Sequence, residues 1–457
     1  MTNRKTHSPG DSSASSARVS PARLNAFNIL RRVADEGAFA SILLATQAEE
    51  LRENDRALCH ELVMGVLRHQ SWLDGLIAHY GNRDPARLDP PVRMALRLGL
   101  YQLRFLSRIP PSAAVNESVN LVRVARVRSA DGFVNAVLRR ATRAPDYDPT
   151  AGLIDPIERL AIDTSHPSWL LERWTKAFGF DEAEAFARSN NDAAPVAFRV
   201  VRRTANEAEI LESLGAAGAI VTPSKITPGA WRVIGATRLI RQLAQAGSIF
   251  VQDEASQLVA HALNAQPDDR VLDVCAAPGS KTTAIADLTS DRAKIIAGDL
   301  HHNRLRTLSA IAATQQLTSI ECVTLDAQHN LPFAEGSFDR VLVDAPCSGT
   351  GTLRRNPEIR WRISAADICD LSTRQTRILL NASRMLRAGG CLVYSTCSVE
   401  PEENEKVVQD FIDSANRFRP LELDVAASLK TTPNTARSWP HREGSVGFFI
   451  AGFRRHD

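Results

Sequence analysis

The sequence predicts a multidomain protein with an all-α N-terminal region, a small α+β module and a C-terminal α/β domain with a doubly wound, mostly parallel sheet. Apolar residues recur at helical spacing from Pro21 to Thr142, helix and strand patterns mix over residues 155–245, and apolar runs alternate with helical stretches from Ile249 to Phe453. At 457 residues the chain is long enough for two or three domains, each with its own core.

The N-terminal part begins with a polar stretch. Residues 1–19 are rich in Ser, Thr and Asp, which predicts a disordered tail. Residues 20–145 predict an all-helical domain of about five to seven helices, separated by breakers such as Asp89-Pro90-Pro91 and Pro110-Pro111. Residues 1–145 carry 21 Lys and Arg against 13 Asp and Glu, whereas the rest carries 34 against 39. This imbalance indicates either a polyanion partner for the first region or a solvated helical surface.

Residues 146–245 are predicted to form a linker and a small α+β module. A helical pattern covers Trp169 to Phe178, and strand-like pieces cover Val196 to Val201 and Trp231 to Ile234. Residues 246–457 then predict the α/β domain. Its expected strands are residues 271–275, 294–298, 320–324, 340–344, 391–395 and 447–453.

A small-residue turn follows the first of these strands and opens a helix. The turn consists of Cys275, Ala276, Ala277, Pro278, Gly279, Ser280 and Lys281. It matches neither the dinucleotide nor the P-loop pattern, so S-adenosylmethionine fits better as the ligand. Asp299 and Asp326 end the next two strands, where carboxylates are expected to meet ribose hydroxyls and the adenine amino group. Each could instead simply cap a strand end or a helix start.

Two cysteines end further predicted strands, where open α/β sheets bind ligands. Cys347 lies in Asp344-Ala345-Pro346-Cys347, and Cys397 lies in Ser395-Thr396-Cys397-Ser398. Two thiols beside Asp344 suit methylation of C5 of a pyrimidine, because thiolate addition to C6 makes C5 nucleophilic and an acid group stabilises N3. The residues alone do not show which of the two thiols is the nucleophile.

The other cysteines and the hydropathy argue against a disulfide-rich, a metal-binding and a membrane-spanning protein. The seven cysteines are scattered without a C-x-x-C pair, so neither a disulfide framework nor a metal site is expected. Cys59, Cys322, Cys369 and Cys391 are expected to pack in the core. No apolar stretch approaches the roughly 20 residues that span a bilayer, and the start is polar, so a cytoplasmic protein without membrane contact is predicted.

Six motifs make the chain resemble the RNA cytosine-C5 methyltransferase family, and within it the bacterial Sun/Fmu-type (RsmB-like) 16S rRNA enzymes. The motifs are Val251-Gln252-Asp253-Glu254-Ala255-Ser256, Cys275-Ala276-Ala277-Pro278-Gly279, Asp344-Ala345-Pro346-Cys347-Ser348-Gly349, Arg354-Arg355-Asn356-Pro357-Glu358, Ser395-Thr396-Cys397-Ser398 and Pro401-Glu402-Glu403-Asn404. The resemblance implies that Cys397 is the nucleophile and that Cys347 assists product release. It also implies that residues 275–281, Asp299, Asp326 and Asp344 bind S-adenosylmethionine or line the site. Arg304 follows Asp299 where the family often has an arginine, or is simply an exposed helix charge.

The N-terminal domain resembles the NusB antiterminator, an all-helical RNA-binding fold. The supporting segments are Asp55-Arg56-Ala57, Gly65-Val66-Leu67-Arg68, Leu98-Gly99-Leu100-Tyr101-Gln102-Leu103, Ala113-Ala114-Val115-Asn116-Glu117-Ser118-Val119 and Phe133-Val134-Asn135-Ala136-Val137-Leu138-Arg139-Arg140. Two positions depart from the family pattern: Ser280 replaces a usual glycine, and Val446 replaces a usual aspartate.

The resemblance implies an S-adenosylmethionine-dependent 16S rRNA cytosine-C5 methyltransferase. The sequence leaves the oligomeric state open, and a monomer is the default expectation. The alternatives are the same chemistry on tRNA or another rRNA site, or an inactive ribosome-assembly RNA-binding factor. For RNA contact, Arg354, Arg355 and Arg360 follow the Pro-Cys loop. The helical domain adds Arg123, Arg126, Arg128, Arg139 and Arg140 as candidates for phosphate contacts.

Overall fold

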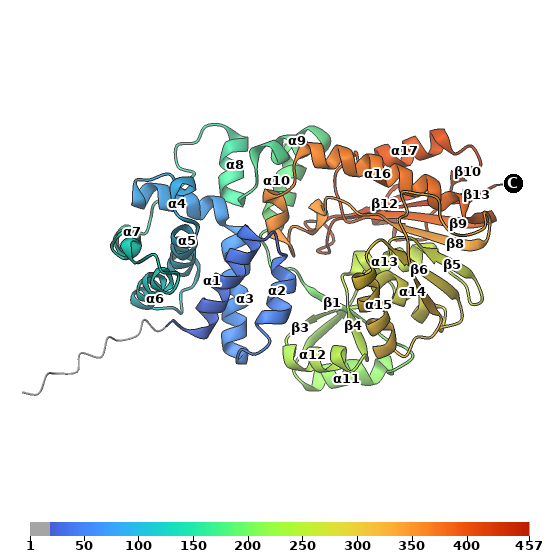
Figure 1. Ribbon diagram of the computed structural model, residues 1–457, viewed down its shortest axis with the longest axis horizontal. Helices are drawn as coiled ribbons and strands as arrows, with labels where there is room; N and C mark the ends of the chain where they lie inside the picture. Colours follow the sequence, from blue (N-terminus) through green and yellow to red (C-terminus); the bar gives the residue numbers. More distant parts are fainter. Residues whose placement is uncertain (1–18, 457) are drawn as a thin grey trace, which may run out of the picture. The chain divides into compact units, whose positions relative to one another are not determined.

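The structure of the protein is a computed structural model that describes residues 19–456 (Figure 1). The chain divides into two compact units, Met1–Ser168 and Trp169–Asp457. Of the predicted tail, residues 1–18 lie outside the described residues. The predicted domain boundaries after residues 145 and 245 stay predictions.

The first unit is all helical, which confirms the predicted N-terminal fold class. Its helices are α1 (Pro21–Asp35), α2 (Ala40–Gln47), α3 (Glu53–Arg68), α4 (Gln70–Gly81), α5 (Pro90–Phe105), α6 (Pro111–Val124), α7 (Asp131–Arg143) and α8 (Pro156–Thr164), with short 3₁₀ helices η1 (Pro85–Arg87) and η2 (Arg128–Ala130). Helices α1, α5, α6 and α8 begin at a proline, which has no N–H to leave unpaired in a first turn. The predicted breakers at 89–91 and 110–111 are therefore helix starts.

Close helix packing in this unit depends on two glycines. A Cβ on Gly65 of α3 would lie 1.9 Å from the ring of Tyr101 on α5. A Cβ on Gly99 of α5 would lie 2.7 Å from the side chain of Leu138 on α7. Both glycines belong to segments that carry the NusB resemblance, and they let α5 pack closely against its neighbours in the core.

The second unit begins with the small α+β module. Its elements are α9 (Ser168–Phe178), α10 (Phe180–Ser189), β1 (Val196–Val200), α11 (Glu207–Ala216), β2 (Ile220–Pro223), β3 (Ala230–Ile234), α12 (Thr237–Gln245) and β4 (Ile249–Val251). The four strands form an antiparallel sheet in the order β2-β3-β1-β4. Phe198 and Val200 pack with Ile210 of α11 and Ile240 of α12, whereas Arg199 between them donates a hydrogen bond to Thr283 in the larger sheet domain.

The larger domain alternates strands and helices and then ends in further strands. Its elements are α13 (Glu254–Leu263), β5 (Arg270–Asp273), α14 (Ser280–Leu288), β6 (Lys294–Asp299), α15 (His302–Thr314), β7 (Ile320–Thr324), β8 (Phe338–Asp344), η3 (Thr350–Thr352), η4 (Pro357–Trp361), α16 (Ala365–Arg384), β9 (Leu386–Thr396), α17 (Glu405–Ser414), β10 (Phe418–Pro420), η5 (Ala427–Leu429), β11 (Lys430–Thr432), β12 (Thr435–Ser438) and β13 (Phe448–Arg455). All six strands expected from the sequence in this domain are present.

The sheet of this domain is mixed rather than mostly parallel. Strands β7, β6, β5, β8 and β9 form a parallel core, and β13, β12, β11 and β10 extend it by antiparallel pairing at the β9 side. The sequence predicted β13 as a strand but not its direction. Loops without α-helices join β10, β11, β12 and β13 in succession, which permits antiparallel pairing. The chain moves outward from β5 to β7 and returns to β8 on the other side of β5. This reversal opens a crevice at the carboxyl ends of β5 and β8.

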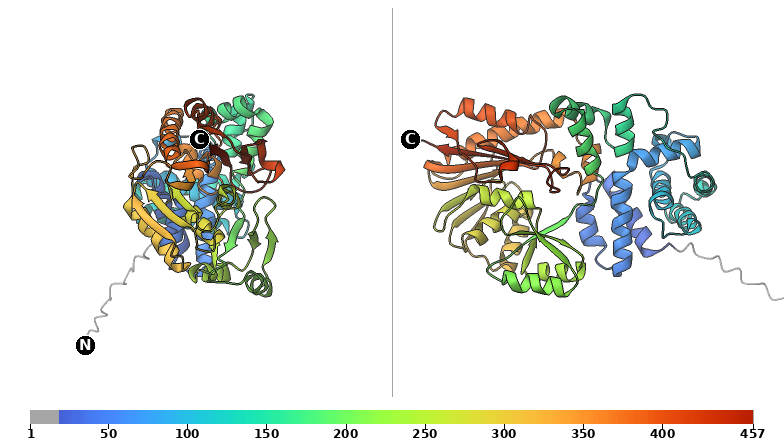
Figure 2. Two further views of the ribbon diagram at one scale, coloured as in Figure 1. Left: turned by 90° about the vertical axis from the view of Figure 1, so that its right-hand side faces the viewer. Right: turned by 180° about the vertical axis from the view of Figure 1, so that it is seen from behind.

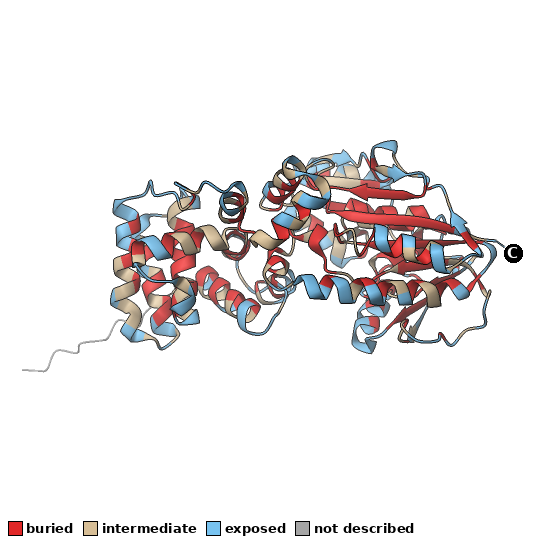
Figure 3. Ribbon diagram, turned by 90° about the horizontal axis from the view of Figure 1, so that it is seen from above, coloured by how far each residue is buried: buried red, intermediate tan, exposed pale blue. Residues whose placement is uncertain are grey.

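Both faces of the sheet are covered, and residues alternate between them along each strand. Val271 and Leu342 pack in a cluster with residues of α13, α14 and α15, whereas Leu272 and Val341 pack in a cluster with residues of α16 and α17. The two helix layers lie on opposite sides of the sheet (Figures 1 and 2). The central strands are consequently buried along most of their length (Figure 3).

The expected core positions of the lone cysteines are only partly confirmed. Cys59 and Cys391 are buried in their clusters. Cys322 and Cys369 are exposed instead, because β7 is the edge of the sheet and Cys369 lies on the outer side of α16. Within residues 19–456, no helix has the length and apolar character to cross a bilayer, and no three His, Cys, Asp or Glu side chains gather as metal ligands.

Candidate functional site

A cavity of about 270 Å³ lies at the carboxyl ends of the parallel strands. The residues that line it come from the carboxyl ends of β6 and β8 and from the loops after β5, β6, β7, β8 and β9, with one residue each from α15 and α16. They are Val274, Cys275, Ala277, Asp299, Leu300, His301, Arg304, Leu325, Asp326, Ala327, Gln328, Asp344, Ala345, Pro346, Cys347, Ile378 and Cys397. The structure thus brings eight of the predicted site residues together. Ala276, Pro278, Gly279, Ser280 and Lys281 lie outside this lining.

The loop after β5 is held by Asp273, the last residue of that strand. Its Oδ2 accepts a hydrogen bond from Thr282 Oγ1 at 2.8 Å, and its Oδ1 accepts one from the Cys275 N–H at 3.4 Å. Burial raises the pKa of Asp273 to about 7. Burial and the neighbouring carboxylates also raise the pKa of Cys275 well above that of an ordinary thiol. Cys275 is therefore a neutral wall of the cavity rather than a nucleophile.

The serine that departs from the family pattern is compatible with this loop. Gly279, not Ser280, has the positive φ of 114°, and a Cβ on Gly279 would lie 2.6 Å from Leu308. Ser280 is the first residue of α14, where helical backbone angles suit any L-residue. The position that requires glycine is therefore 279, and this chain has a glycine there.

Asp299 and Asp326, two of the predicted site residues, both line the cavity. Asp299 Oδ2 accepts a hydrogen bond from the Ala277 N–H at 3.2 Å, which ties the β6 end to the loop after β5. Arg304 Nη2 donates to the carbonyl oxygen of Ala277 at 2.5 Å, so this arginine supports the loop and lines the cavity. Asp326 Oδ1 accepts a hydrogen bond from the Gln328 N–H at 2.9 Å. Two carboxylates are thus fixed on one side of the cavity.

The two cysteines predicted from the sequence are in contact. Their Sγ atoms lie 3.4 Å apart, and both side chains are partly exposed to the cavity. The hydrogen bond with Cys397, and then burial, raise the pKa of Cys347 well above that of an ordinary thiol. At this distance either thiol can donate a hydrogen bond to the sulfur of the other.

Lys281 lies beside the thiols rather than in the cavity lining. Its Nζ is 2.6 Å from Asp344 Oδ2, and Ser395 Oγ donates to Asp344 Oδ1 at 2.8 Å. Burial opposes the charge of the lysine, but attraction to Asp344 and to Cys397 dominates and raises the pKa of Lys281. The ammonium also lies 4.9 Å from the ring centre of Phe448. Sequence reasoning missed this pairing, because Lys281 and Asp344 are 63 positions apart.

The arginines after the Pro-Cys loop were predicted to contact RNA. Burial contradicts this prediction for Arg354 and Arg360, whereas Arg355 is partly exposed and its contact with RNA stays a prediction. Arg360 is fully buried, and Arg354 is 9% exposed. Arg354 donates hydrogen bonds to the carbonyl oxygens of Gly444 and Ala193, and Arg355 forms an ion pair with Asp253 at 3.1 Å. These cations join segments of the second unit.

Comparisons with known proteins agree with this geometry. The family model for the 16S rRNA methyltransferase RsmB/F matches residues 260–454, the NusB family model matches residues 20–143, and the RsmF/B-like ferredoxin-like domain model matches residues 166–248. The chain is 35% identical to the probable ribosomal RNA small subunit methyltransferase B of Bacillus subtilis (strain 168), over 94% of this chain and 98% of that protein. The chain belongs to the RsmB/F methyltransferase family.

Further members and solved structures give the same result. The ribosomal RNA small subunit methyltransferase B of Pseudomonas putida is 35% identical over 94% of this chain and 97% of its own length. The crystal structure of PH0851 superimposes with a TM-score of 0.83 at 27% identity, over 96% of this chain and 99% of that chain. NSun6 from Pyrococcus horikoshii with SFG shares the fold, with a TM-score of 0.58 at 21% identity, over 64% of this chain and 98% of that chain.

The cofactor of this RsmB/F methyltransferase is S-adenosylmethionine, and the cavity fits it. Asp299 and Asp326 offer fixed carboxylate acceptors for hydroxyl and amino groups, and both are held by backbone N–H donors. Leu300, Leu325 and Ile378 supply apolar surface for a flat ring. The role of each residue at the cofactor stays a prediction.

Proposed function

We propose that the protein methylates C5 of a cytosine in 16S rRNA through a covalent bond between Cys397 and C6 of the base. One observation carries the proposal: the two thiols touch each other at the wall of the cofactor cavity, beside the Lys281–Asp344 pair. The names of the relatives, which are ribosomal RNA small subunit methyltransferases, support the substrate.

The first step requires a thiolate, and the contact between the thiols favours Cys397 for this role. Either thiol can donate to the other sulfur, and with Cys347 as the donor this hydrogen bond stabilises a thiolate at Cys397. The ammonium of Lys281 attracts negative charge at Cys397. The Cys397 sulfur adds to C6, and the electrons of the C5–C6 double bond move toward C5 and N3.

The ammonium of Lys281, paired with Asp344, offsets the negative charge that develops on the ring. Asp344 lines the cavity, and Lys281 and Ser395 fix the two oxygens of its carboxylate, so it is placed to accept a hydrogen bond from the N4 amino group of the base. Bound S-adenosylmethionine supplies the electrophilic methyl group, which C5 accepts.

Release restores the aromatic ring. A base takes the C5 proton, the C5–C6 double bond forms again, and the electrons of the C6–S bond return to Cys397. The thiol of Cys347, 3.4 Å away, hydrogen-bonds to the departing sulfur and so assists this step. Cys347 thereby acts after Cys397, in the order that the family resemblance implies.

The first unit is proposed to bind the RNA. Arg123, Arg128, Arg139 and Arg140 are exposed on its helices or loops. Contacts of these cations with phosphates release counterions, so we expect affinity for RNA to fall steeply as salt is added. A filter-binding titration at several salt concentrations measures this slope, and removal of two of the arginines should reduce it by about two.

Incorporation of a labelled methyl group into unmodified 16S rRNA tests the proposed function. Cys397→Ala should abolish incorporation, and Cys347→Ala should accumulate a covalent protein–RNA adduct. Cys369→Ala is the matched control, because Cys369 is exposed and does not line the cavity. Unchanged labelling in both site variants would overturn the mechanism. Mapping of the label to a base other than cytosine would overturn the substrate.

A further inference from the structure

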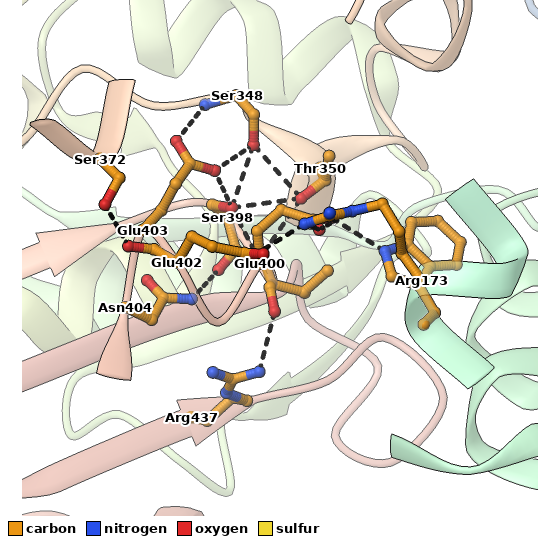
Figure 4. A network of polar contacts seen from close by, with 12 residues as sticks. Arg173, Ser348, Thr350, Ser372, Ser398, Glu400, Glu402, Glu403, Asn404 and Arg437 are labelled. Atoms are coloured by element: carbon orange, nitrogen blue, oxygen red, sulfur yellow. Dashed lines mark hydrogen bonds and ion pairs between the residues drawn. The ribbon is translucent and has the colours of Figure 1, made fainter. Parts of the chain in front are cut away.

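Both cysteine loops are held from behind by side chains that do not touch the cavity. Glu403 is fully buried in the segment before α17. Its Oε1 accepts a hydrogen bond from the Ser348 N–H at 2.8 Å, and its Oε2 accepts bonds from the hydroxyls of Ser348 and Ser398 (Figure 4). Its Oε1 also accepts a hydrogen bond from Gln375 Nε2 at 2.9 Å. Ser348 follows Cys347, and Ser398 follows Cys397. One carboxylate therefore bridges the two thiol loops.

Two neighbours of Glu403 complete the support on the other side of each cysteine. Gln375 Nε2 also donates to the carbonyl oxygen of Pro346, which precedes Cys347, at 2.9 Å. Asn404 Nδ2 donates to the carbonyl oxygen of Ser398 at 2.9 Å, and Asn404 Oδ1 accepts from Thr396 Oγ1 at 2.6 Å. Each cysteine is thus fixed at the residues before and after it.

The hydrogen-bond pattern requires a carboxylate at position 403. Its four donors are neutral groups, and only a carboxylate offers acceptor sites on both oxygens to all of them. A glutamine keeps the shape of the side chain but replaces one oxygen by an NH₂ donor, which leaves the hydroxyls of Ser348 and Ser398 to rearrange. A buried group with several bonds also holds its neighbours rigidly, because an unpaired partner would be costly there.

We propose that Glu403 is a positioning residue that holds the two catalytic thiols in contact by bridging their loops. It does not line the cavity, so it acts through Cys347 and Cys397 and not on the substrate or the cofactor. The role rests on the proposed function, in which the two thiols act one after the other on the same base. If Glu403 served only to stabilise the fold, its substitution would lower the free energy of unfolding but would leave the distance between the Cys347 and Cys397 sulfurs in the folded protein unchanged.

Disulfide formation reports this separation without RNA. The oxidant diamide takes two electrons and two protons from Cys347 and Cys397, which form an S–S bond while diamide becomes the hydrazine. In the full-length reduced protein, Glu403→Gln should slow this reaction by about tenfold, because a looser pair has a lower effective concentration. The matched control is Glu402→Gln, whose partly exposed carboxylate pairs with Arg173. The control should react within about twofold of wild type.

A second measurement follows the reaction on 16S rRNA. Glu403→Gln should accumulate the covalent protein–RNA adduct and release methylated product slowly, as expected for Cys347→Ala. If the wild type forms no adduct and methylates no cytosine, the proposed function fails, while the diamide reaction still decides the role of Glu403.

A wild-type rate of disulfide formation in folded Glu403→Gln would overturn the proposal. If that variant does not fold, Ser398→Ala replaces it, since this change removes one of the four hydrogen bonds to the carboxylate. The proposal expects slower disulfide formation in Ser398→Ala by about threefold, and an unchanged rate would equally overturn it.

Discussion

Replacement of Gly351 by alanine should displace the nucleophile's loop. The Gly351 N–H donates to the carbonyl oxygen of Cys397 at 3.0 Å, and the Gly351 carbonyl accepts from the Gly447 N–H at 2.8 Å. A Cβ at this position would lie 2.1 Å from the Gly447 oxygen and 2.8 Å from the Cys397 oxygen. Since nonbonded carbon and oxygen atoms stay about 3 Å or more apart, one of the segments must move by about 1 Å.

The expected effect is larger on catalysis than on folding. Crowding of this kind costs about 1 to 3 kcal/mol of unfolding free energy. A displacement of about 1 Å at a nucleophile lowers kcat by about 100-fold. The dissociation constant of S-adenosylmethionine should stay within about threefold of wild type, because Gly351 does not line the cavity.

Methyl incorporation at saturating cofactor, thermal unfolding and calorimetric cofactor binding measure the three quantities. Gly132→Ala is the control: Gly132 lies in α7, and beyond the backbone of its own helix and its chain neighbours nothing lies within 4 Å of the added Cβ. That control should be neutral or more stable by up to about 1 kcal/mol, because alanine favours helix. A wild-type kcat together with an unchanged Tm in Gly351→Ala would refute the steric reasoning.

Three further predictions concern the charged groups of the site. Lys281→Met should lower the single-turnover methylation rate by about 100-fold or more, since the cation beside Asp344 is lost, and a rate within threefold of wild type would contradict this. Asp299→Ala should raise the calorimetric dissociation constant of S-adenosylmethionine about 10- to 100-fold, and unchanged binding would exclude the carboxylate as a ligand. Burial raises the pKa of Asp273 to about 7 in the folded protein. Between about pH 4 and pH 7 the unfolded chain has lost this proton while the folded protein keeps it, so the free energy of unfolding falls as the pH rises through this range. Asp273→Asn should therefore lose less unfolding free energy than wild type between pH 5 and pH 8 in denaturant titrations, and equal losses would show that Asp273 is not the group responsible.

Local patterns predicted the elements of this fold well. The prolines at 90 and 111 start helices, and the apolar runs before Cys275, Cys347 and Cys397 are strands, because proline geometry and side-chain periodicity act within a few residues. The antiparallel extension of the sheet was not predicted. Pairing of β13 with β9 depends on which edge remains free after the parallel core has formed, and no short segment encodes that.

The sequence by itself determined the chemistry available to this protein: two thiols and three carboxylates at strand ends, and a small-residue turn that opens a helix. Parallel strands place their carboxyl ends at one edge, so these groups had to converge. Only the tertiary structure decided the partners. Lys281 pairs with Asp344, and Arg360 is buried although its charge suggested a surface. Such contacts join residues far apart in the chain, and they depend on which elements pack together rather than on any local pattern.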